Sequence, residues 1–173
     1  MNFILTQLFG GVALILVVIS YLLKSKVCFL GIQIIANIFY GLSFIFSNAI
    51  VAGINSFVSI LRVLLLYYYA RKNKNAPIEW IFIFSSLYLL VGVLFFNSYY
   101  DIVVMITPIL FTIAMWLKNM QFVRLMLLIP NVILVVYAII LNAYTTALLN
   151  FIELITIIIA LIKYSRQGAK LGN

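Results

Sequence analysis

The stretch "IEWIFIFSSLYLLVGVLFFN", residues 78–97, decides the predicted fold of this chain. It is apolar and about long enough to cross a bilayer as a helix, for which roughly 20 residues are needed. Apolar stretches on either side of it match one another, as shown below, but residues 78–97 have no counterpart. The sequence therefore predicts a single unmatched crossing that separates two matched sets of helices.

The composition is that of a membrane protein. Apolar residues make up 67% of the 173 residues, and charged residues only 8%. This balance excludes a water-soluble core and is typical of a chain that crosses the bilayer several times. The stretch "MNFILTQLFGG" lacks a basic region and a small-residue cleavage site, so we expect the first apolar run to be a retained helix. We expect one transmembrane domain over residues 1–173.

Apolar runs of spanning length predict seven helices, because an isolated strand could not satisfy its backbone hydrogen bonds in lipid. The runs lie at about residues 3–23, 28–46, 50–70, 78–97, 102–117, 121–141 and 145–164. The fifth run is the shortest. The predicted fold class is thus all-α and transmembrane.

The net charge of +8 is distributed in a way that indicates topology. Basic residues follow alternate helices, at Lys24 and Lys26, at Arg71, Lys72 and Lys74, at Lys118 and Arg124, and at Lys163, Arg166 and Lys170. The intervening turns carry no Lys or Arg. The positive-inside rule then places the amino terminus outside and the carboxyl terminus in the cytoplasm. We expect these clusters to meet anionic lipid headgroups and not nucleic acid.

The chain matches itself when it is shifted by 94 residues. "LLKS" at 22–25 then meets "WLKN" at 116–119, and "SNAI" at 47–50 meets "LNAY" at 141–144. The shift pairs Asn37 with Asn131 and Asn48 with Asn142, and after one extra residue it pairs Asn55 with Asn150, Tyr69 with Tyr164 and Arg71 with Arg166. Apolar matches carry little information in such a composition, but asparagines in register with basic residues indicate a duplication.

Each predicted copy contains three helices, which is an odd number. Two such copies can share one orientation only if an extra helix crosses between them, and this gives parallel repeats related by an axis along the membrane normal. The predicted plan is a 3+1+3 arrangement of two parallel three-helix bundles. Residues 1–74 form the first repeat, 75–98 the linker helix and 99–173 the second repeat.

The residues also resemble a known family. The stretch "NAIVAGINSFVSILRVLLLYY", residues 48–68, resembles the third helix of the bacterial inner-membrane YgjV family, and the 3+1+3 plan resembles the SWEET and SemiSWEET transporters. Gln33 and Asn37 match the family's helix-two glutamine and asparagine, and Asn55 and Arg62 match its helix-three asparagine and arginine. The resemblance covers nearly the whole chain. It implies a SWEET-like bundle in the bacterial inner membrane and a transport role without an assigned substrate.

The chain departs from these families in its second half. SWEET-type proteins place hinge prolines in both repeats, whereas Pro108 and Pro130 lie only in the second repeat here. Members of the resembled family often carry a carboxylate near the position of Asn150 and an amide one turn later, whereas this chain has Asn150 and then Glu153. The resemblance therefore assigns site residues more directly in the first repeat.

The third predicted helix carries a polar stripe. Asn55, Ser59 and Arg62 are spaced so that all three project from one helix face. At 1.5 Å per residue, Asn55 lies roughly 8 Å and Arg62 roughly 18 Å from the outer end. An arginine at the centre of a membrane helix costs roughly 2.5 to 3.5 kcal/mol on insertion scales. Arg62 is therefore expected to have a partner, to line a wet cavity or to extend toward the interface.

Glu153 is the only acidic residue well inside a predicted helix. The repeat places it at the position of Val58, one turn from Arg62 in the other copy, within reach of two long side chains. The sequence therefore predicts an ion pair between Arg62 and Glu153 across the interface of the two bundles.

The matched amides have two readings. Asn55 and Asn150 are expected at one depth in both bundles, where they could hold a hydroxylated or amide-bearing solute from both sides. Alternatively, each could hydrogen-bond a neighbouring helix, a contact worth roughly 0.6 to 2 kcal/mol. Asn37 and Asn131, in the middle of helices two and six, either line the solute path or brace the bundle.

The remaining features are assigned to structure. Asn48 and Asn142 are expected in short outer turns, because asparagine suits turn backbones. Pro108 and Pro130 are expected to permit kinks. Four aromatic residues are expected in the core and in interfacial belts, with stacking on a ring of the solute as the alternative, namely Tyr21, Tyr40, Tyr137 and Trp116.

The sequence favours a transporter over an enzyme. Histidine is absent, Cys28 is the only cysteine, and the acidic residues are scattered, so we expect no catalytic or metal site and no cofactor. The leading hypothesis is a passive or proton-linked facilitator of a small polar solute, sugar-like or another metabolite, that works by alternating access. A membrane-embedded regulatory or interaction subunit is the alternative, and a PnuC-like vitamin carrier is a further one, although that family's tryptophan pair is missing. A homo-oligomer stays possible.

Overall fold

The computed structural model describes residues 2–46, 50–96, 99, 101–140 and 144–170. These residues form seven α-helices and no strand, as predicted. The helices are α1 (Asn2–Tyr21), α2 (Lys26–Phe46), α3 (Ile50–Arg71), α4 (Glu79–Leu94), α5 (Asp101–Trp116), α6 (Met120–Ile140) and α7 (Tyr144–Lys170). The predicted limits agree closely, except that α4 ends at Leu94 and α7 continues to Lys170.

Five of the described helices, α1, α2, α3, α6 and α7, are long and apolar enough to cross a membrane. The other two, α4 and α5, are apolar but contain only 16 residues each. A helix of that length is about 24 Å long at 1.5 Å per residue. The predicted span over residues 78–97 was therefore longer than the helix that forms there.

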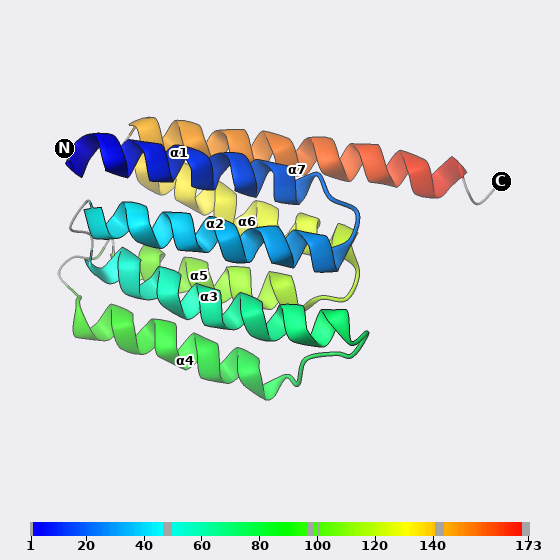
Figure 1. Ribbon diagram of the computed structural model, residues 1–173, viewed down its shortest axis with the longest axis horizontal. Coiled ribbons are helices and arrows are strands. Elements are labelled where there is room, and N and C mark those ends of the chain that lie inside the picture. Colours follow the sequence, from blue (N-terminus) through cyan, green and yellow to red (C-terminus); the bar gives the residue numbers. More distant parts are fainter. Residues whose placement is uncertain (1, 47–49, 97–98, 100, 141–143, 171–173) are drawn as a thin grey trace.

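The helices lie in two layers (Figure 1). Successive helices run in opposite directions, so their connections alternate between the two ends of the molecule. In one layer α2 packs against both α1 and α3, and in the other α6 packs against both α5 and α7. The layers meet where α1 contacts α7 and where α3 contacts α5, and α4 lies at one edge against α3 and α5.

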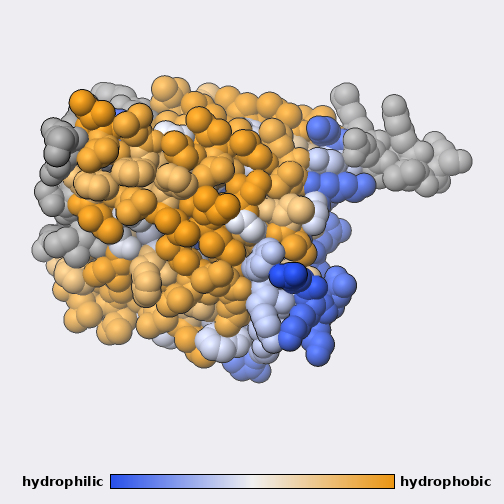
Figure 2. Space-filling view, viewed as in Figure 1, coloured by the Kyte–Doolittle hydropathy of each residue, from blue (hydrophilic) through white to orange (hydrophobic). Residues whose placement is uncertain are grey.

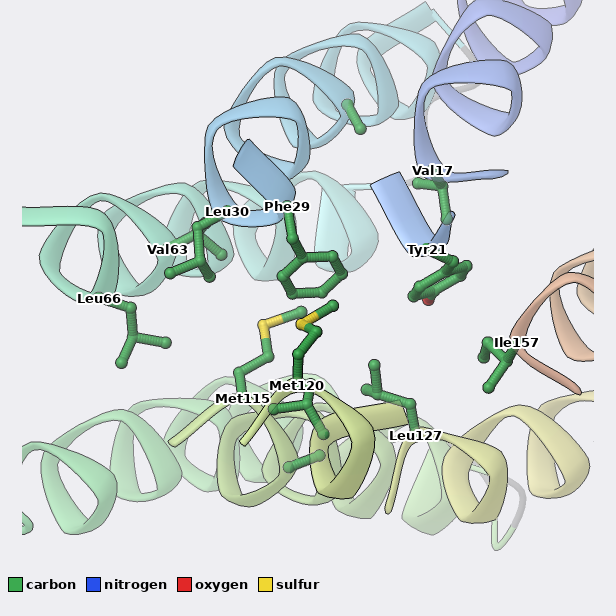
Figure 3. Close-up of a cluster of buried hydrophobic side chains, with 13 residues drawn as sticks. Val17, Tyr21, Phe29, Leu30, Val63, Leu66, Met115, Met120, Leu127 and Ile157 are labelled. Carbon is green, nitrogen blue, oxygen red and sulfur yellow. The ribbon is translucent and has the colours of Figure 1, made fainter. Parts of the chain in front are cut away.

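A hydrophobic core joins the two layers (Figure 3). Phe29 from α2 and Val63 from α3 face Met115 from α5 and Leu127 from α6, and all four are almost fully buried. The members of this core lie in the half of the molecule where α1 ends and α2 begins. Burial of apolar side chains thus holds the layers together mainly at that end.

Basic and polar residues gather at the same end (Figure 2). Lys24, Lys72, Lys74 and Lys118 are exposed there, next to the connections that follow α1, α3 and α5. Much of the rest of the surface in this view is hydrophobic. We call this part of the molecule the basic end.

Helix α3 stops at the basic end in a Schellman motif. Asn73 has a φ of 52°, a left-handed conformation that asparagine tolerates. The N–H of Asn73 donates to the carbonyl of Ala70 at 3.1 Å, and the N–H of Lys74 donates to that of Tyr69 at 3.0 Å. These bonds satisfy carbonyls at the helix end and turn the chain toward α4.

Arg124, counted among the basic residues that follow the fifth helix, is buried inside α6 and caps α1. Its Nε donates to the carbonyl of Tyr21 at 3.1 Å, its Nη2 to the carbonyl of Leu23, and its Nη1 to Oε1 of Gln121 at 3.3 Å. The guanidinium also lies 4.6 Å from the ring of Tyr164. A cation is favourable at a helix carboxyl end, where carbonyls lack helical partners. The topology rule counted Arg124 as a surface charge, whereas helix packing buries it.

A second cap joins the same two layers, but here the donor and the acceptor have changed layers. Lys26, the first residue of α2, donates through Nζ to the carbonyl of Leu117 just after α5. Leu23 and Leu117 are the residues that the 94-residue shift superposes. The pairs Arg124–Leu23 and Lys26–Leu117 are called the reciprocal caps below, because each layer caps a helix of the other.

Candidate functional site

Arg62 lies on α3, where that helix meets α4 and α5. Its side chain is buried, with 3% of its surface exposed. Nη1 donates to Oγ1 of Thr112 at 2.8 Å and to the carbonyl of Pro108 at 3.1 Å. The guanidinium carbon lies 5.7 Å from the centre of the Tyr88 ring, and Nε is buried without a hydrogen-bond partner. These neighbours are all electrically neutral.

The contact between Arg62 and α5 is made at a proline. Pro108 has no N–H, so one helical hydrogen bond is missing in this part of α5. The hydroxyl of Thr112 donates to the carbonyl of Pro108 at 2.7 Å, and Arg62 donates to the same oxygen. Arg62 therefore connects the two layers at their α3–α5 contact.

The predicted polar stripe of α3 continues away from Arg62. Oγ of Ser59 lies 2.8 Å from the hydroxyl oxygen of Tyr88, so Ser59 and Arg62 both meet that tyrosine from α4. Farther along the stripe, Oδ1 of Asn55 is buried without a hydrogen-bond partner. Asn55, Ser59 and Arg62 are called the α3 stripe below.

Glu153 lies at the other contact between the layers. Its side chain on α7 is buried, and the hydroxyl of Tyr40 on α2 donates to Oε1 at 3.1 Å. The hydroxyl of Tyr21 on α1 lies 3.4 Å from Oε2 as a second donor. Asn131 from α6 also lies beside the Tyr21 hydroxyl. We call Glu153, Tyr21, Tyr40 and Asn131 the Glu153 group.

The predicted ion pair between Arg62 and Glu153 does not form, so this prediction was wrong. The repeat placed the two residues at similar depths, but depth does not determine which helices are neighbours. Arg62 lies at the α3–α5 contact and Glu153 at the α1–α7 contact. Their hydrogen bonds go to Thr112 and Pro108 in one case and to tyrosines in the other.

Sequence reasoning missed the role of the two tyrosines. Tyr21 lies in the hydrophobic core and Tyr40 packs against it, as expected, but the hydroxyl groups of both also meet Glu153. The only signal in the sequence was indirect, because a lone acid inside a membrane helix needs hydrogen-bond donors. Which donors these are depends on the packing of α1 and α2 against α7.

Three of the predicted site asparagines bond within their own helices. In each, Nδ2 donates to the carbonyl four residues earlier, at 2.7 to 2.9 Å. The bonds run from Asn37 to Gln33, from Asn131 to Leu127 and from Asn150 to Thr146. For Asn150, whose alternative reading was a bond to a neighbouring helix, the bond that Nδ2 makes lies inside α7. Oδ1 of Asn131 is buried and has no partner.

Other predicted positions are structural or lie outside the described residues. Gln33 is buried and donates to Oγ of Ser20 at 2.8 Å, which links α2 to α1. Asn48 and Asn142, predicted to form turns, are not among the described residues. Within the described part of the chain no cluster of His, Cys, Asp or Glu could hold a metal ion.

Comparison with known proteins places most of the chain in one family. The model of the family Imp-YgjV, described as bacterial inner membrane protein, matches residues 4–168. No curated protein and no solved structure matches the chain. The matched region includes both the α3 stripe and the Glu153 group.

Proposed function

The chain belongs to the Imp-YgjV family of bacterial inner membrane proteins, and from this premise we propose that it transports a small polar solute by alternating access. One observation carries the proposal. Arg62 and Glu153, of opposite charge, are buried at two different contacts between the helix layers. Charged residues inside membrane helices commonly mark solute paths, ion paths or proton relays, because they are costly to keep there for packing alone.

The proposed transporter consists of two parallel copies of a three-helix unit, α1–α3 and α5–α7, with α4 as the linker. The 94-residue match supports this arrangement, and so do the interlayer contacts. In such a repeat, α1 corresponds to α5 and α3 corresponds to α7. The α1–α7 contact and the α3–α5 contact are then equivalent, and both are present. The acceptors of the reciprocal caps obey the same exchange, since Leu23 and Leu117 are matched residues, although the donors Arg124 and Lys26 are not.

The basic end faces the cytoplasm in this proposal, and the amino terminus lies outside. The exposed lysines at that end support this orientation through the positive-inside rule (Figure 2). The hydrophobic core and the reciprocal caps join the layers at the same end. In this proposal the described state is closed toward the cytoplasm, and transport requires the layers to separate at this end.

Glu153 is the proposed point of proton linkage. Its carboxyl group accepts hydrogen bonds from tyrosines of α1 and α2, so a change in its charge acts on the α1–α7 contact directly. Glu153→Gln removes the charge and keeps the shape. If transport is proton-linked, uptake by the wild type should depend on an imposed pH gradient, and we expect Glu153→Gln to lose this dependence. If the carrier is passive, uptake by the wild type should not depend on the pH gradient.

Counterflow in liposomes tests the proposed transport. Purified protein is reconstituted, and exchange of labelled sugars, amino acids and small carboxylates is measured against protein-free liposomes. We expect exchange of at least one solute to exceed that in protein-free liposomes and to fall in Arg62→Gln. Lys118→Gln, which changes an exposed residue, is the matched control and should behave like wild type. Exchange no faster than in empty liposomes, with a stoichiometric protein partner recovered from native membranes, would instead identify an interaction subunit.

A further inference from the structure

Among the residues that the structure describes, two arginines are buried in helices long enough to span a membrane, and they differ in one respect. Every nitrogen of the Arg124 guanidinium donates to an oxygen, and two of those oxygens are carbonyls at the end of α1. Arg62 is buried to a similar degree, with 3% exposed against 1% for Arg124. Its Nη1 makes two hydrogen bonds, but its Nε has no partner. The cap of α1 and the bond to Gln121 account for every donor group of Arg124, whereas the Nε donor of Arg62 has no acceptor.

The charge of Arg62 is also uncompensated. Thr112, Pro108 and Tyr88 surround it, and none of them is acidic. The one described acid inside a membrane-spanning helix, Glu153, meets tyrosines at the other interlayer contact. A buried cation without a counter-charge is unfavourable. An anion that binds at Arg62 would remove this cost.

We propose that Arg62 binds the carboxylate of the transported solute, and that this solute is a small monocarboxylate. The inference rests on the proposed transport function. Nε and a neighbouring Nη are the two donors with which arginine forms a bidentate pair with a carboxylate, and Nε of Arg62 is unused. One negative charge balances one guanidinium. A phosphate monoester carries a charge of about −1.5 to −2 and would leave excess negative charge buried.

The α3 stripe supplies the remaining recognition. Asn55 lies on the same helix face as Arg62, seven residues away, which is about 10 Å along the helix axis. Its Oδ1 is a buried acceptor without a donor. A hydroxyl or amino group on the solute would supply that donor. Ser59 and Tyr88 lie between the two positions as a further polar pair.

The first arm of the test needs no ligand. Thermal unfolding in detergent is compared for wild type, Arg62→Met and Arg124→Met. Because Arg62 is held for binding at the expense of stability, Arg62→Met should unfold at the same temperature or about 1 to 5 °C higher. Arg124→Met removes the cap of α1 and should unfold at a clearly lower temperature. An equal loss in both variants would make Arg62 a structural link and overturn the proposal.

The second arm measures anion binding with acetate, lactate and pyruvate, each against its neutral amide at constant ionic strength set with chloride. At least one carboxylate should raise the unfolding temperature of wild type by about 2 °C or more through mass action, and the amides should not. The shift should vanish in Arg62→Met and persist in Lys118→Gln. Equal shifts with the amides or in Arg62→Met, a response to chloride alone, or no shift with any carboxylate would overturn the assignment.

Failure of this inference is distinguishable from failure of the proposed function. If neutral solutes undergo counterflow and Arg62→Met does not affect it, the proposed transport function stands and the proposed carboxylate site is wrong. If carboxylates bind in a way that depends on Arg62 but no solute undergoes counterflow, the proposed site stands and the proposed transport function is wrong.

Discussion

At the scale of single residues, Glu153 shows how a buried acid is accommodated within helices of spanning length. The carboxyl group accepts a hydrogen bond from Tyr40 and lies close to the hydroxyl of Tyr21, so two helices contribute to its environment. Tyr21 also belongs to the hydrophobic core, and Ile157, one turn beyond Glu153 on α7, belongs to the same core (Figure 3). The acid therefore lies next to the region that joins the layers, where its hydrogen bonds contribute to stability.

This arrangement predicts coupling between Tyr40 and Glu153. A hydrogen bond contributes about 0.5 to 1.5 kcal/mol between neutral groups and about 1.5 to 3 kcal/mol when one group is charged, so Tyr40→Phe should lower the free energy of unfolding by about 0.5 to 3 kcal/mol. In a Glu153→Gln background the same substitution should cost less. Unfolding of the four proteins of this double-mutant cycle, followed in mild detergent, measures the difference. Additive losses would show that the tyrosine acts through packing alone.

Hydropathy identified Arg62, Ser59, Asn55 and Glu153 as polar residues at membrane depth, and all of them lie within the helices that were predicted. Their partners could not be predicted. A repeat places residues at matching heights, but it does not state which helices touch, and so it paired Arg62 wrongly with Glu153. Arg124 was missed for a related reason, since a count of basic residues cannot separate a charge that faces lipid headgroups from one that caps a neighbouring helix.

At the scale of helices, α4 is held to α5 by a close approach at one glycine. A Cβ added to Gly92 would lie 2.1 Å from Cγ of Met105 and 2.8 Å from its Sδ. Real atoms do not come this close, so any larger residue at position 92 requires Met105 or the helix to move. The edge position of α4 thus depends on this contact as well as on its apolar surface.

Gly92→Ala should therefore destabilise the protein. Overpacking of this kind costs about 1 to 3 kcal/mol, which would appear as a lower unfolding temperature. The second substitution Met105→Ala should restore part of the loss, because it removes the atoms that the new methyl group meets. Gly53→Ala is the control, since a Cβ there has no atom within 4 Å. A loss in the control as large as that at position 92 would contradict the packing explanation.

The number and type of helices followed from the sequence, because apolar runs between basic clusters leave few alternatives in a bilayer. The residue at which α4 ends did not follow from the sequence. Phe95 and Phe96 continue the apolar run after Leu94, and hydropathy alone cannot separate a helical apolar residue from one beyond the helix end. The helix end is a matter of backbone hydrogen bonding, which the composition does not report.

At the scale of the whole molecule, the two layers are joined most firmly at the basic end. The hydrophobic core and both reciprocal caps lie there (Figures 1 and 3). If the layers separate during transport, these contacts must break together. Loss of the caps should then favour the separated state without changing the rest of the core.

Cysteine labelling at Ala114, a buried core residue of α5, tests this expectation. In a Cys28→Ser background, Ala114→Cys should react slowly with a maleimide. Adding Lys26→Gln and Arg124→Gln should raise the labelling rate by about tenfold, since each cap is a charge-assisted hydrogen bond. Lys118→Gln with Lys163→Gln removes the same number of charges from exposed positions of the basic end and should leave the rate unchanged. An unchanged rate in the first pair would show that the caps do not hold the layers together.

The 16-residue length of α4 and α5 has a consequence for the surrounding lipid. Each helix is about 24 Å long against a hydrocarbon thickness of about 30 Å, and side chains such as Phe82 and Leu90 on α4 are exposed on its surface. Acyl chains beside this edge must compress to meet the polar ends of the helices, at a cost of fractions of a kcal/mol per Å. The protein should therefore be more stable in short-chain dimyristoleoyl than in long-chain dierucoyl phosphatidylcholine. Because of this hydrophobic mismatch at one side, the protein should also prefer the thinner regions of its own membrane.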